Sequence, residues 1–279
     1  MQVGRPSLTA RGAAAHRASH QTLEGGAIFS DPFALKILDD ETRTSMDEAA
    51  TDLSSRPMRL FIAARSRFSE DTLAGCVARG ARQIVVLGAG LDTFSLRNPY
   101  AGLGVRVFDV DYPATQSWKR ERLAQAGLAI PASLTFVPVD FERHSLAEGF
   151  AESGFEADRP AFFQWLGVVP YLTREAIATT LAFIAGVPDS EAVFDYAEPL
   201  ENYPPKRRAN MMAIAARAAS RGEPWLSLFD PAELSQMLRN TGFGFVEDLG
   251  LAELTERFYG PLREGIVIGP GGHVVRAGK

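Results

Sequence analysis

Cysteine is almost absent from this chain, since Cys76 is the only one among 279 residues. A single cysteine excludes an intrachain disulfide framework, CxxC redox chemistry and cysteine zinc clusters. The chain also lacks any uninterrupted apolar run approaching the roughly 20 residues of a membrane span. Its N-terminus lacks the apolar core of a secretory signal. We therefore expect a soluble, cytoplasmic protein with no membrane partner.

An excess of positive charge is missing as well. The 29 lysines and arginines are outnumbered by 34 acidic residues, which gives a formal net charge of -5 and a pI near 5.5. Such a chain has no global basic field for phosphate backbones, so we expect no nucleic-acid partner. With 46% hydrophobic residues, the chain can build a substantial core. Its length favours one large domain with an insertion, or two small ones, and no feature indicates an oligomeric state.

The stretch from Gln83 to Arg97 reads QIVVLGAGLDTFSLR. Its continuous apolar run predicts a parallel strand buried on both faces. Gly88 and Gly90 follow at once, and glycine accepts positive φ and lets a ligand approach the backbone closely. Open α/β sheets expose a nucleotide crevice at the carboxyl edge in this way. An ordinary tight turn is the alternative, because short glycine motifs often occur by chance.

A third glycine, which the dinucleotide fingerprint requires two residues further on, is missing. Thr93 stands in its place in GAGLDT. Close passage of a pyrophosphate over a helix N-terminus is therefore disfavoured, and a cofactor without phosphate, above all S-adenosylmethionine, fits better. A nicotinamide-dependent oxidoreductase on a similar sheet and a non-catalytic cofactor-binding module remain the rival hypotheses.

Acidic residues end the next two predicted strands. The strand at 105–111 (VRVFDVD) ends in Asp109 and Asp111, and a carboxylate at this position usually accepts both hydrogens of a ribose diol. Alternation sends both side chains to the same face, so periodicity does not choose between them, although position favours Asp111. The strand at 134–140 ends in Asp140, followed by Phe141, and this pair could bracket an adenine. A helix N-cap and a core phenylalanine are the alternative.

The other elements follow from periodicity and from capping signals. The predicted helices cover 13–19, 32–38, 114–126, 173–185 and 230–240, with two linked helices over 56–78 and an inserted helix within 200–228. Further strands are predicted at 161–169, 191–197, 244–249 and 273–277, the last two antiparallel. This order predicts an α/β fold with a doubly wound, mostly parallel seven-stranded sheet.

The whole chain, 1–279, is expected to form a single domain. An N-terminal helical segment (1–80) would precede a cofactor-binding core (81–197), a helical insert or lid (198–229) and a C-terminal helix with strands (230–279). Met211 and Met212 on the insert could offer an adaptable apolar wall to the crevice, or pack inside.

Four motifs carry a resemblance to a known family. LGAGLDT, VFDVDYP, VPVDF and WLGVVPYLT, together with AHRAS and AARSRFSED nearer the N-terminus, are similar to the leucine carboxyl methyltransferase family and its bacterial S-adenosylmethionine-dependent relatives. The resemblance covers most of the chain. It implies a Rossmann-like class I methyltransferase fold with S-adenosylmethionine as cofactor. Leu166 departs from the pattern, since many relatives have glutamate there.

The resemblance also implies site residues. Arg65 would hold the cofactor's carboxylate by a bidentate pair, and Arg17 occupies a basic position of the family near the same site. The glycine turn would pass under the methionine part and the ribose, Asp111 would hold the ribose, and Asp140 with Phe141 would address the adenine. The candidate cofactor-binding set is Arg17, Arg65, Gly88, Ala89, Gly90, Asp111, Tyr112, Asp140, Phe141 and Gln164.

Methyl transfer from a sulfonium is an in-line displacement, so alignment is the main task of the protein. A carboxylate acceptor is already a nucleophile, whereas a hydroxyl must lose a proton, usually to histidine. The only histidines are His16, His20, His144 and His273. Tyr171 is better placed to contact the acceptor, with core packing as its alternative. We therefore expect an O-methyltransferase acting on a carboxylate or hydroxyl of a small-molecule biosynthetic intermediate. Methylation of a protein C-terminus is disfavoured, because nothing obviously builds a protein-docking face.

Overall fold

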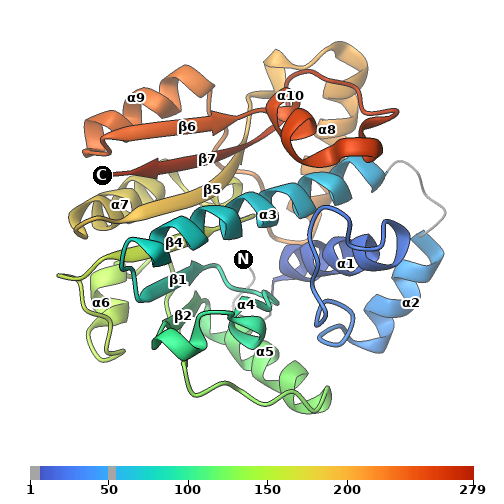
Figure 1. Cartoon of the computed structure of the whole chain (residues 1–279). Coiled ribbons are helices and arrows are strands. Elements are labelled where there is room, and N and C mark those ends of the chain that lie inside the picture. The colour runs from blue at the N-terminus through green and yellow to red at the C-terminus, as the bar shows by residue number, and fades with distance from the viewer. Residues whose placement is uncertain (1–6, 50–54) are drawn as a thin grey trace.

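A seven-stranded sheet forms the centre of the molecule in the computed structural model, which describes residues 7–49 and 55–279 (Figure 1). The strand order is β3-β2-β1-β4-β5-β7-β6. All neighbouring strands run parallel except β7, which pairs antiparallel with both β5 and β6. The strands are β1 (Gln83–Leu87), β2 (Arg106–Asp111), β3 (Leu134–Pro138), β4 (Ala161–Trp165), β5 (Glu191–Ala197), β6 (Phe245–Leu249) and β7 (Gly272–Gly278). The predicted doubly wound, mostly parallel seven-stranded sheet is confirmed.

Helices cover both faces of this sheet, which explains why its central strands are apolar throughout. In β1 every residue is buried, with Val85 and Leu87 facing one hydrophobic cluster and Ile84 and Val86 the other. The first cluster includes side chains of α6 (Leu146–Phe150), α7 (Arg174–Gly186) and α9 (Pro231–Thr241). The second includes side chains of α3 (Arg56–Ala78), which crosses the face turned to the viewer in Figure 1, and of α10 (Leu251–Leu254). Glycine-turn and strand-end residues therefore sit on a scaffold packed from two sides.

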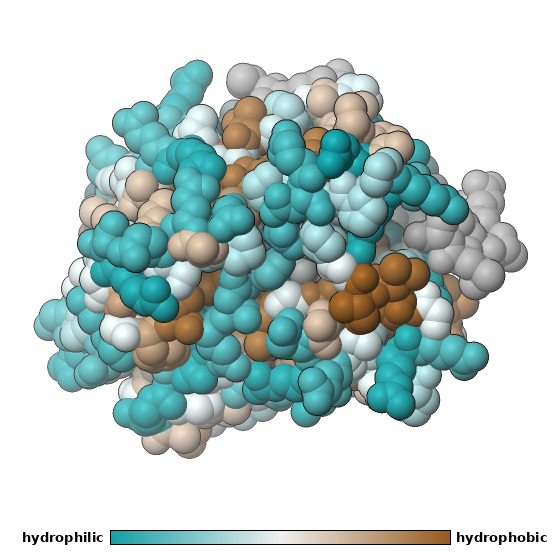
Figure 2. Space-filling model, turned by 90° about the horizontal axis from the view of Figure 1, so that it is seen from above, coloured by the Kyte–Doolittle hydropathy of each residue, from teal (hydrophilic) through white to brown (hydrophobic). Residues whose placement is uncertain are grey.

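Further helices and helical turns connect the strands after β1. They are the helices α4 (Phe94–Arg97), α5 (Pro113–Gln125) and α8 (Pro205–Ser220), the 3-10 turns Ala101–Leu103, Val169–Tyr171, Leu200–Asn202 and Gly260–Arg263, and a π-helical turn at Thr255–Tyr259. None of the helices in the described ranges is both long and apolar enough to cross a lipid bilayer. On the face of the molecule shown in Figure 2, hydrophilic residues predominate and hydrophobic ones form small separate groups.

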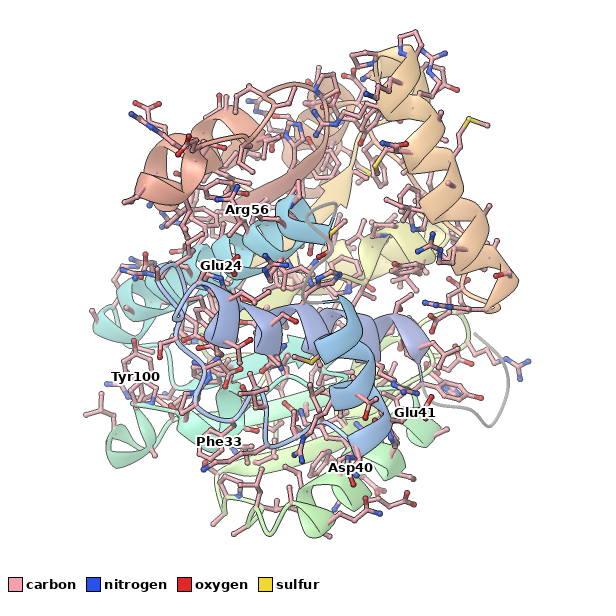
Figure 3. The ribbon with its side chains drawn as sticks, turned by 90° about the vertical axis from the view of Figure 1, so that its right-hand side faces the viewer. Glu24, Phe33, Asp40, Glu41, Arg56 and Tyr100 are labelled. Atoms are coloured by element: carbon pink, nitrogen blue, oxygen red, sulfur yellow. The ribbon has the colours of Figure 1, made fainter. Side chains whose placement is uncertain are left out.

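The N-terminal segment packs beside the sheet through α1 (Leu8–Leu23) and α2 (Asp40–Ala49). Alanines of α1 join a small apolar cluster that also contains Leu91, just after the glycine turn, and Leu123 of α5. At the other end of α1, Glu24 accepts three hydrogen bonds from Arg59 of α3, at 2.6 to 3.0 Å. Figure 3 shows Glu24 at this end of α1, beside α3. The segment is therefore fixed both to the glycine turn and to the main helix of one face.

Several predicted boundaries were wrong. The stretch 56–78 is one helix, because Ser66 donates to the carbonyl of Ile62 within the helix instead of starting a new one. α1 extends well beyond 13–19, and α2 was not predicted. The stretch 32–38 forms turns and not a helix. Asp31 does accept from the amide of Phe33 at 3.0 Å, but its other oxygen is held by Arg17 and Thr93.

The fourth strand is also shorter than predicted. β4 ends at Trp165, whereas the apolar sequence continues to Val169. Gly167 adopts a φ of 76°, and its amide donates to Asp195 Oδ1 at 2.5 Å. The chain therefore turns away from the sheet four residues early. The predicted helices after Thr173 and Asp230 and the antiparallel C-terminal strands are confirmed.

Candidate active site

A cavity of about 460 Å³ opens where the parallel strands end, as the crevice rule for α/β sheets predicts. Its floor consists of the glycine turn after β1 and the ends of β2, β3 and β4. Its other walls come from the first turns of α1, from α3, and from residues 223–226 after α8. The size is typical of a small-molecule site. All eleven residues that the sequence analysis selected line this one cavity.

Glycine is needed at both positions of the turn after β1. Gly88 and Gly90 have φ of 65° and 43°, in the left-handed region. A Cβ at Gly88 would lie 2.2 Å from Val168 Cγ2, and one at Gly90 would lie 2.8 Å from the Cβ of Ala10. The turn is therefore covered closely by α1 on one side and by the segment after β4 on the other.

The position of the missing third glycine is occupied by a side chain that anchors the N-terminal segment. Thr93 Oγ1 donates to Asp31 Oδ2 at 2.6 Å, and the same oxygen accepts from Arg17 Nε at 2.7 Å. Arg17 Nη2 also donates to the carbonyl of Leu91 at 2.6 Å. Arg17 lines the cavity, and its Nη1 makes no hydrogen bond within the described residues. Arg17 thus supports the glycine turn, and one of its nitrogens remains available to a ligand.

The two acids of β2 have different environments. Asp111 lines the cavity, and its oxygens accept the backbone amides of Gly90 at 2.5 Å and of Tyr112 at 2.6 Å. Burial raises the pKa of Asp111 to about 6, although both amides act in the opposite direction. Asp109 does not line the cavity and forms a buried ion pair with Lys119 at 2.5 Å. Side-chain alternation could not decide which acid faces the cavity. The structure does, because Lys119 holds Asp109 in a buried ion pair away from the cavity wall.

Arg65 lines the cavity from α3, the helix that packs on one face of the sheet. Its Nη1 donates to Asp195 Oδ2 on β5 at 2.7 Å, and both side chains are buried. The Nε of Arg65 is buried without a partner among the described residues. A buried donor without a partner is costly, so a site for an acceptor atom is expected beside it.

The remaining predicted residues form the far end of the floor. Asp140 Oδ1 accepts from the amide of Glu142 at 3.1 Å, and Phe141 packs against Trp165. The next helix is capped by Ser145, so Asp140 is not the N-cap that was its alternative. Gln164 Oε1 accepts from the hydroxyl of Ser69 at 3.0 Å. Ala89 and Tyr112 also line the cavity, as does Leu166, which stands where many relatives have glutamate.

Tyr171 also lines the cavity, from the 3-10 turn after β4. Burial raises its pKa above the ordinary value, the hydrogen bond from Trp225 acts against this, and the charge of Glu223 adds to it. The backbone amide of Leu226 donates to the carbonyl of Pro170 at 2.7 Å. The turn that carries Tyr171 and the segment after α8 are therefore held together.

Three site residues were missed in the sequence, namely Asp31, Asp195 and Glu223. Asp195 is an acid in the middle of a strand that is buried throughout, which is a usable sign of a buried pair. Glu223 lies in an irregular stretch with no periodicity to mark it. Met211 and Met212 do not line the cavity, so the expectation of an apolar wall from them was wrong. Met212 is 54% exposed and does not pack inside either, whereas Met211 is half-buried.

Histidine takes no part in the cavity wall. All four histidines lie in the described ranges, and none lines the cavity. His273 contacts Asp248 and Glu198, and His20 accepts the amide of Ile28 and contacts Glu24. Burial, together with Arg59 and Arg65, lowers the pKa of His16 to about 4. The expectation that a histidine could serve as base receives no support from this arrangement.

Comparison with known proteins agrees with this site. The model of the leucine carboxyl methyltransferase family matches residues 10–185, more than half of the chain. YktD of Bacillus subtilis (strain 168), assigned to the S-adenosyl-L-methionine-dependent methyltransferases, is 34% identical over 236 residues, which cover 84% of this chain and 75% of YktD. A Mycobacterium avium (strain 104) protein with the same assignment is 33% identical over 182 residues, 60% of this chain and 57% of the relative. The chain thus matches little more than half of that mycobacterial protein.

Among solved structures, a duf574 family protein from Streptomyces avermitilis superposes with a TM-score of 0.60 at 15% identity, covering 96% of this chain and 97% of that one. It supports the fold assignment. The fold, the cavity and the relatives together define a methyltransferase of the class that depends on S-adenosylmethionine. Within that class, the chain belongs to the leucine carboxyl methyltransferase family.

Proposed function

We propose that this protein transfers the methyl group of S-adenosylmethionine to an oxygen of a small-molecule acceptor, a carboxylate or a hydroxyl of a biosynthetic intermediate. One observation carries the proposal. One cavity is lined by Asp111, by Arg65 with its unpartnered Nε, and by Tyr171. The first two suit the donor's ribose and carboxylate, and the third is proposed to contact the acceptor.

The donor half is assigned by the chemistry of the free groups. A carboxylate beside Arg65 would satisfy its buried Nε, and the Nη1 of Arg17, which also lines the cavity, offers a second donor. Asp111 accepts two backbone amides and, as a carboxylate, can accept the hydroxyls of a ribose in addition. Asp140, Phe141 and Gln164 would hold the adenine end, while Gly88, Ala89, Gly90 and Tyr112 would form the floor. The ten residues suit a nucleoside with a charged amino-acid tail.

The chain contributes positioning and exclusion of water. The cofactor supplies an electrophilic methyl group on sulfur, so the protein must hold an acceptor oxygen in line with it. Arg65 is fixed by Asp195, Asp111 by two amides, and Tyr171 by the segment bonded to Pro170. α1 and residues 223–226 cover the cavity, which limits the acceptor to a small molecule or a slender end of a larger one.

Catalysis is tested by incubating the protein with methyl-labelled S-adenosylmethionine and a metabolite extract. We expect a labelled small molecule that carries the label as the methyl group of an ether or an ester. Labelled product should disappear in Arg65→Ala and persist in Arg67→Ala. Arg67 is exposed two residues further along α3, where it pairs with Asp71 at 2.8 Å. If the protein binds the cofactor but labels nothing in any extract, the non-catalytic binding module would be the better account.

A further inference from the structure

Glu223 is a buried carboxylate that lines the cavity and is not among the proposed donor-binding residues. It follows α8, is 7% exposed and lines the same cavity as the glycine turn. Its Oε2 accepts the backbone amide of Thr9 at 2.8 Å. The neighbouring Ala10 is the residue that covers Gly90. Glu223 therefore lies where α1 covers the glycine turn, and its charge also acts on the phenol of Tyr171, the proposed acceptor contact.

The second oxygen of Glu223 distinguishes it from the other acids that line the cavity. Oε1 makes no hydrogen bond with any residue in the described ranges. Both oxygens of Asp111 accept backbone amides, and both oxygens of Glu142 accept from Thr173. Asp92 accepts from the amide of Phe94 and from Gln164. Asp140 accepts the amide of Glu142 and lies 3.7 Å from Arg143.

Glu223 lies close to Tyr171, because its charge adds to the raised pKa of that phenol. Its partner Thr9 is in the first turn of the 16-residue helix α1, where the helix dipole stabilises an anion. Arg65 acts on the same phenol in the opposite direction, but its Nη1 is paired with Asp195 at 2.7 Å. The cavity wall also contains the apolar residues Ile62, Val168, Leu172, Pro224 and Leu226.

We infer that Glu223 selects the acceptor, so that the methylated group is a neutral hydroxyl and not a carboxylate. A hydroxyl can donate a hydrogen bond to the free Oε1, and the same oxygen can take up the proton that the hydroxyl loses when its oxygen receives the methyl group. A carboxylate acceptor would have no proton to donate and would place a second negative charge beside a buried one, which is strongly unfavourable. This inference rests on the proposed O-methyl transfer and narrows its acceptor.

The test uses matched probes, because the natural acceptor need not be known. Phenol, benzoate and benzylamine share a ring and differ in the charge of the polar group, and cyclohexanol, cyclohexanecarboxylate and cyclohexylamine form an aliphatic set. Their dissociation constants are measured by ligand-observed NMR on protein saturated with S-adenosylhomocysteine at pH 7. We expect each hydroxyl probe to bind at least about tenfold more tightly than its carboxylate partner, since like charges repel in a buried site.

The variant Glu223→Gln removes the charge and keeps an amide oxygen that can still accept from Thr9, so the fold is retained. In this variant the disadvantage of the carboxylate probes should largely vanish. Glu142→Gln is the control, because it removes a charge from the exposed rim of the same cavity and should leave the selectivity unchanged.

Four results would overturn the inference. They are equal or tighter binding of the carboxylates to the wild type, an unchanged preference in Glu223→Gln, tightest binding of the amines, and no binding of any probe. Calorimetry on the same samples distinguishes failure of the acceptor assignment from failure of the proposed methyl transfer. If S-adenosylhomocysteine binds and carboxylates are preferred, only the acceptor assignment fails, whereas absence of S-adenosylhomocysteine binding overturns both.

Discussion

Arg65 and Asp195 join the main helix of one face to the fifth strand through a buried hydrogen bond of 2.7 Å between Nη1 and Oδ2. Asp195 also accepts the amide of Gly167, which turns the chain out of the sheet after β4. One carboxylate thus fixes the arginine and the loop that leads to Tyr171. The proposed donor contact of Arg65 and the proposed acceptor contact of Tyr171 therefore depend on the same strand residue.

Replacing Arg65 by alanine should weaken binding of S-adenosylhomocysteine by at least about 1.5 kcal/mol, the lower range for a charged hydrogen bond. Because Asp195 would lose its buried partner, the free energy of unfolding should fall as well. Arg65→Lys keeps a charge but not the guanidinium geometry, and should bind with intermediate affinity. Calorimetric titration of the folded variants measures the effect, with Arg67→Ala as the control on the same helix. Unchanged affinity in Arg65→Ala would remove Arg65 from the donor site.

The affinity for S-adenosylhomocysteine should depend on pH through Asp111. Its pKa is raised to about 6, chiefly by burial, so the unliganded protein carries a neutral Asp111 at pH 5 and a carboxylate at pH 7. Only the carboxylate can accept both ribose hydroxyls, so binding should weaken as the pH falls through 6, by at most about tenfold per pH unit for one proton. Asp111→Asn should bind weakly with no such step near pH 6. A wild-type profile identical in shape to that of the variant would contradict this role.

Gly88 can be tested against a glycine that shares its backbone conformation but not its surroundings. Gly104 also has positive φ, at 72°, and nothing lies within 4 Å of its Cβ position. Gly104→Ala should therefore lower the free energy of unfolding only by the cost of the left-handed conformation, roughly 1 kcal/mol. Gly88→Ala adds a Cβ 2.2 Å from Val168 and should be more destabilising. Chemical unfolding measures both, and only Gly88→Ala should reduce cofactor affinity. Equal losses of unfolding free energy in the two variants would show that close packing is not needed at the turn.

Asp109 is expected to act in stability and not in binding. Lys119→Met would leave it buried without its partner, which should cost about 3 to 5 kcal/mol of unfolding free energy. The double variant Asp109→Leu with Lys119→Met should recover most of that loss, since both charges are gone. Cofactor affinity of the folded double variant should stay near that of the wild type. A large loss of affinity there would return Asp109 to the list of ribose ligands.

The sequence predicted the sheet and the floor of the cavity well, because both depend on short local patterns. Apolar runs mark buried strands, Gly88 and Gly90 mark the turn, and acids mark the strand ends, so neighbouring strands bring these residues together without further information. Arg65 was predicted only through the resemblance to a family, because no periodicity in the sequence relates this helix residue to the end of β1.

The covering wall could not be predicted, because its residues are brought together by contacts between distant segments. Glu223 meets Thr9 across more than two hundred residues, and Asp31 joins α1 to Thr93. The stretch 32–38 carried a helix start signal, yet Asp31 is engaged by Arg17. A single-sequence pattern cannot reveal that a capping side chain has a stronger partner elsewhere.

The central claim is that this cavity binds the methyl donor, and isothermal calorimetry tests it most directly. The account predicts that S-adenosylhomocysteine binds at one site per chain, that nicotinamide dinucleotides do not bind, and that Arg65→Ala loses the affinity that Arg67→Ala retains. Binding of a nicotinamide dinucleotide without binding of S-adenosylhomocysteine would contradict it.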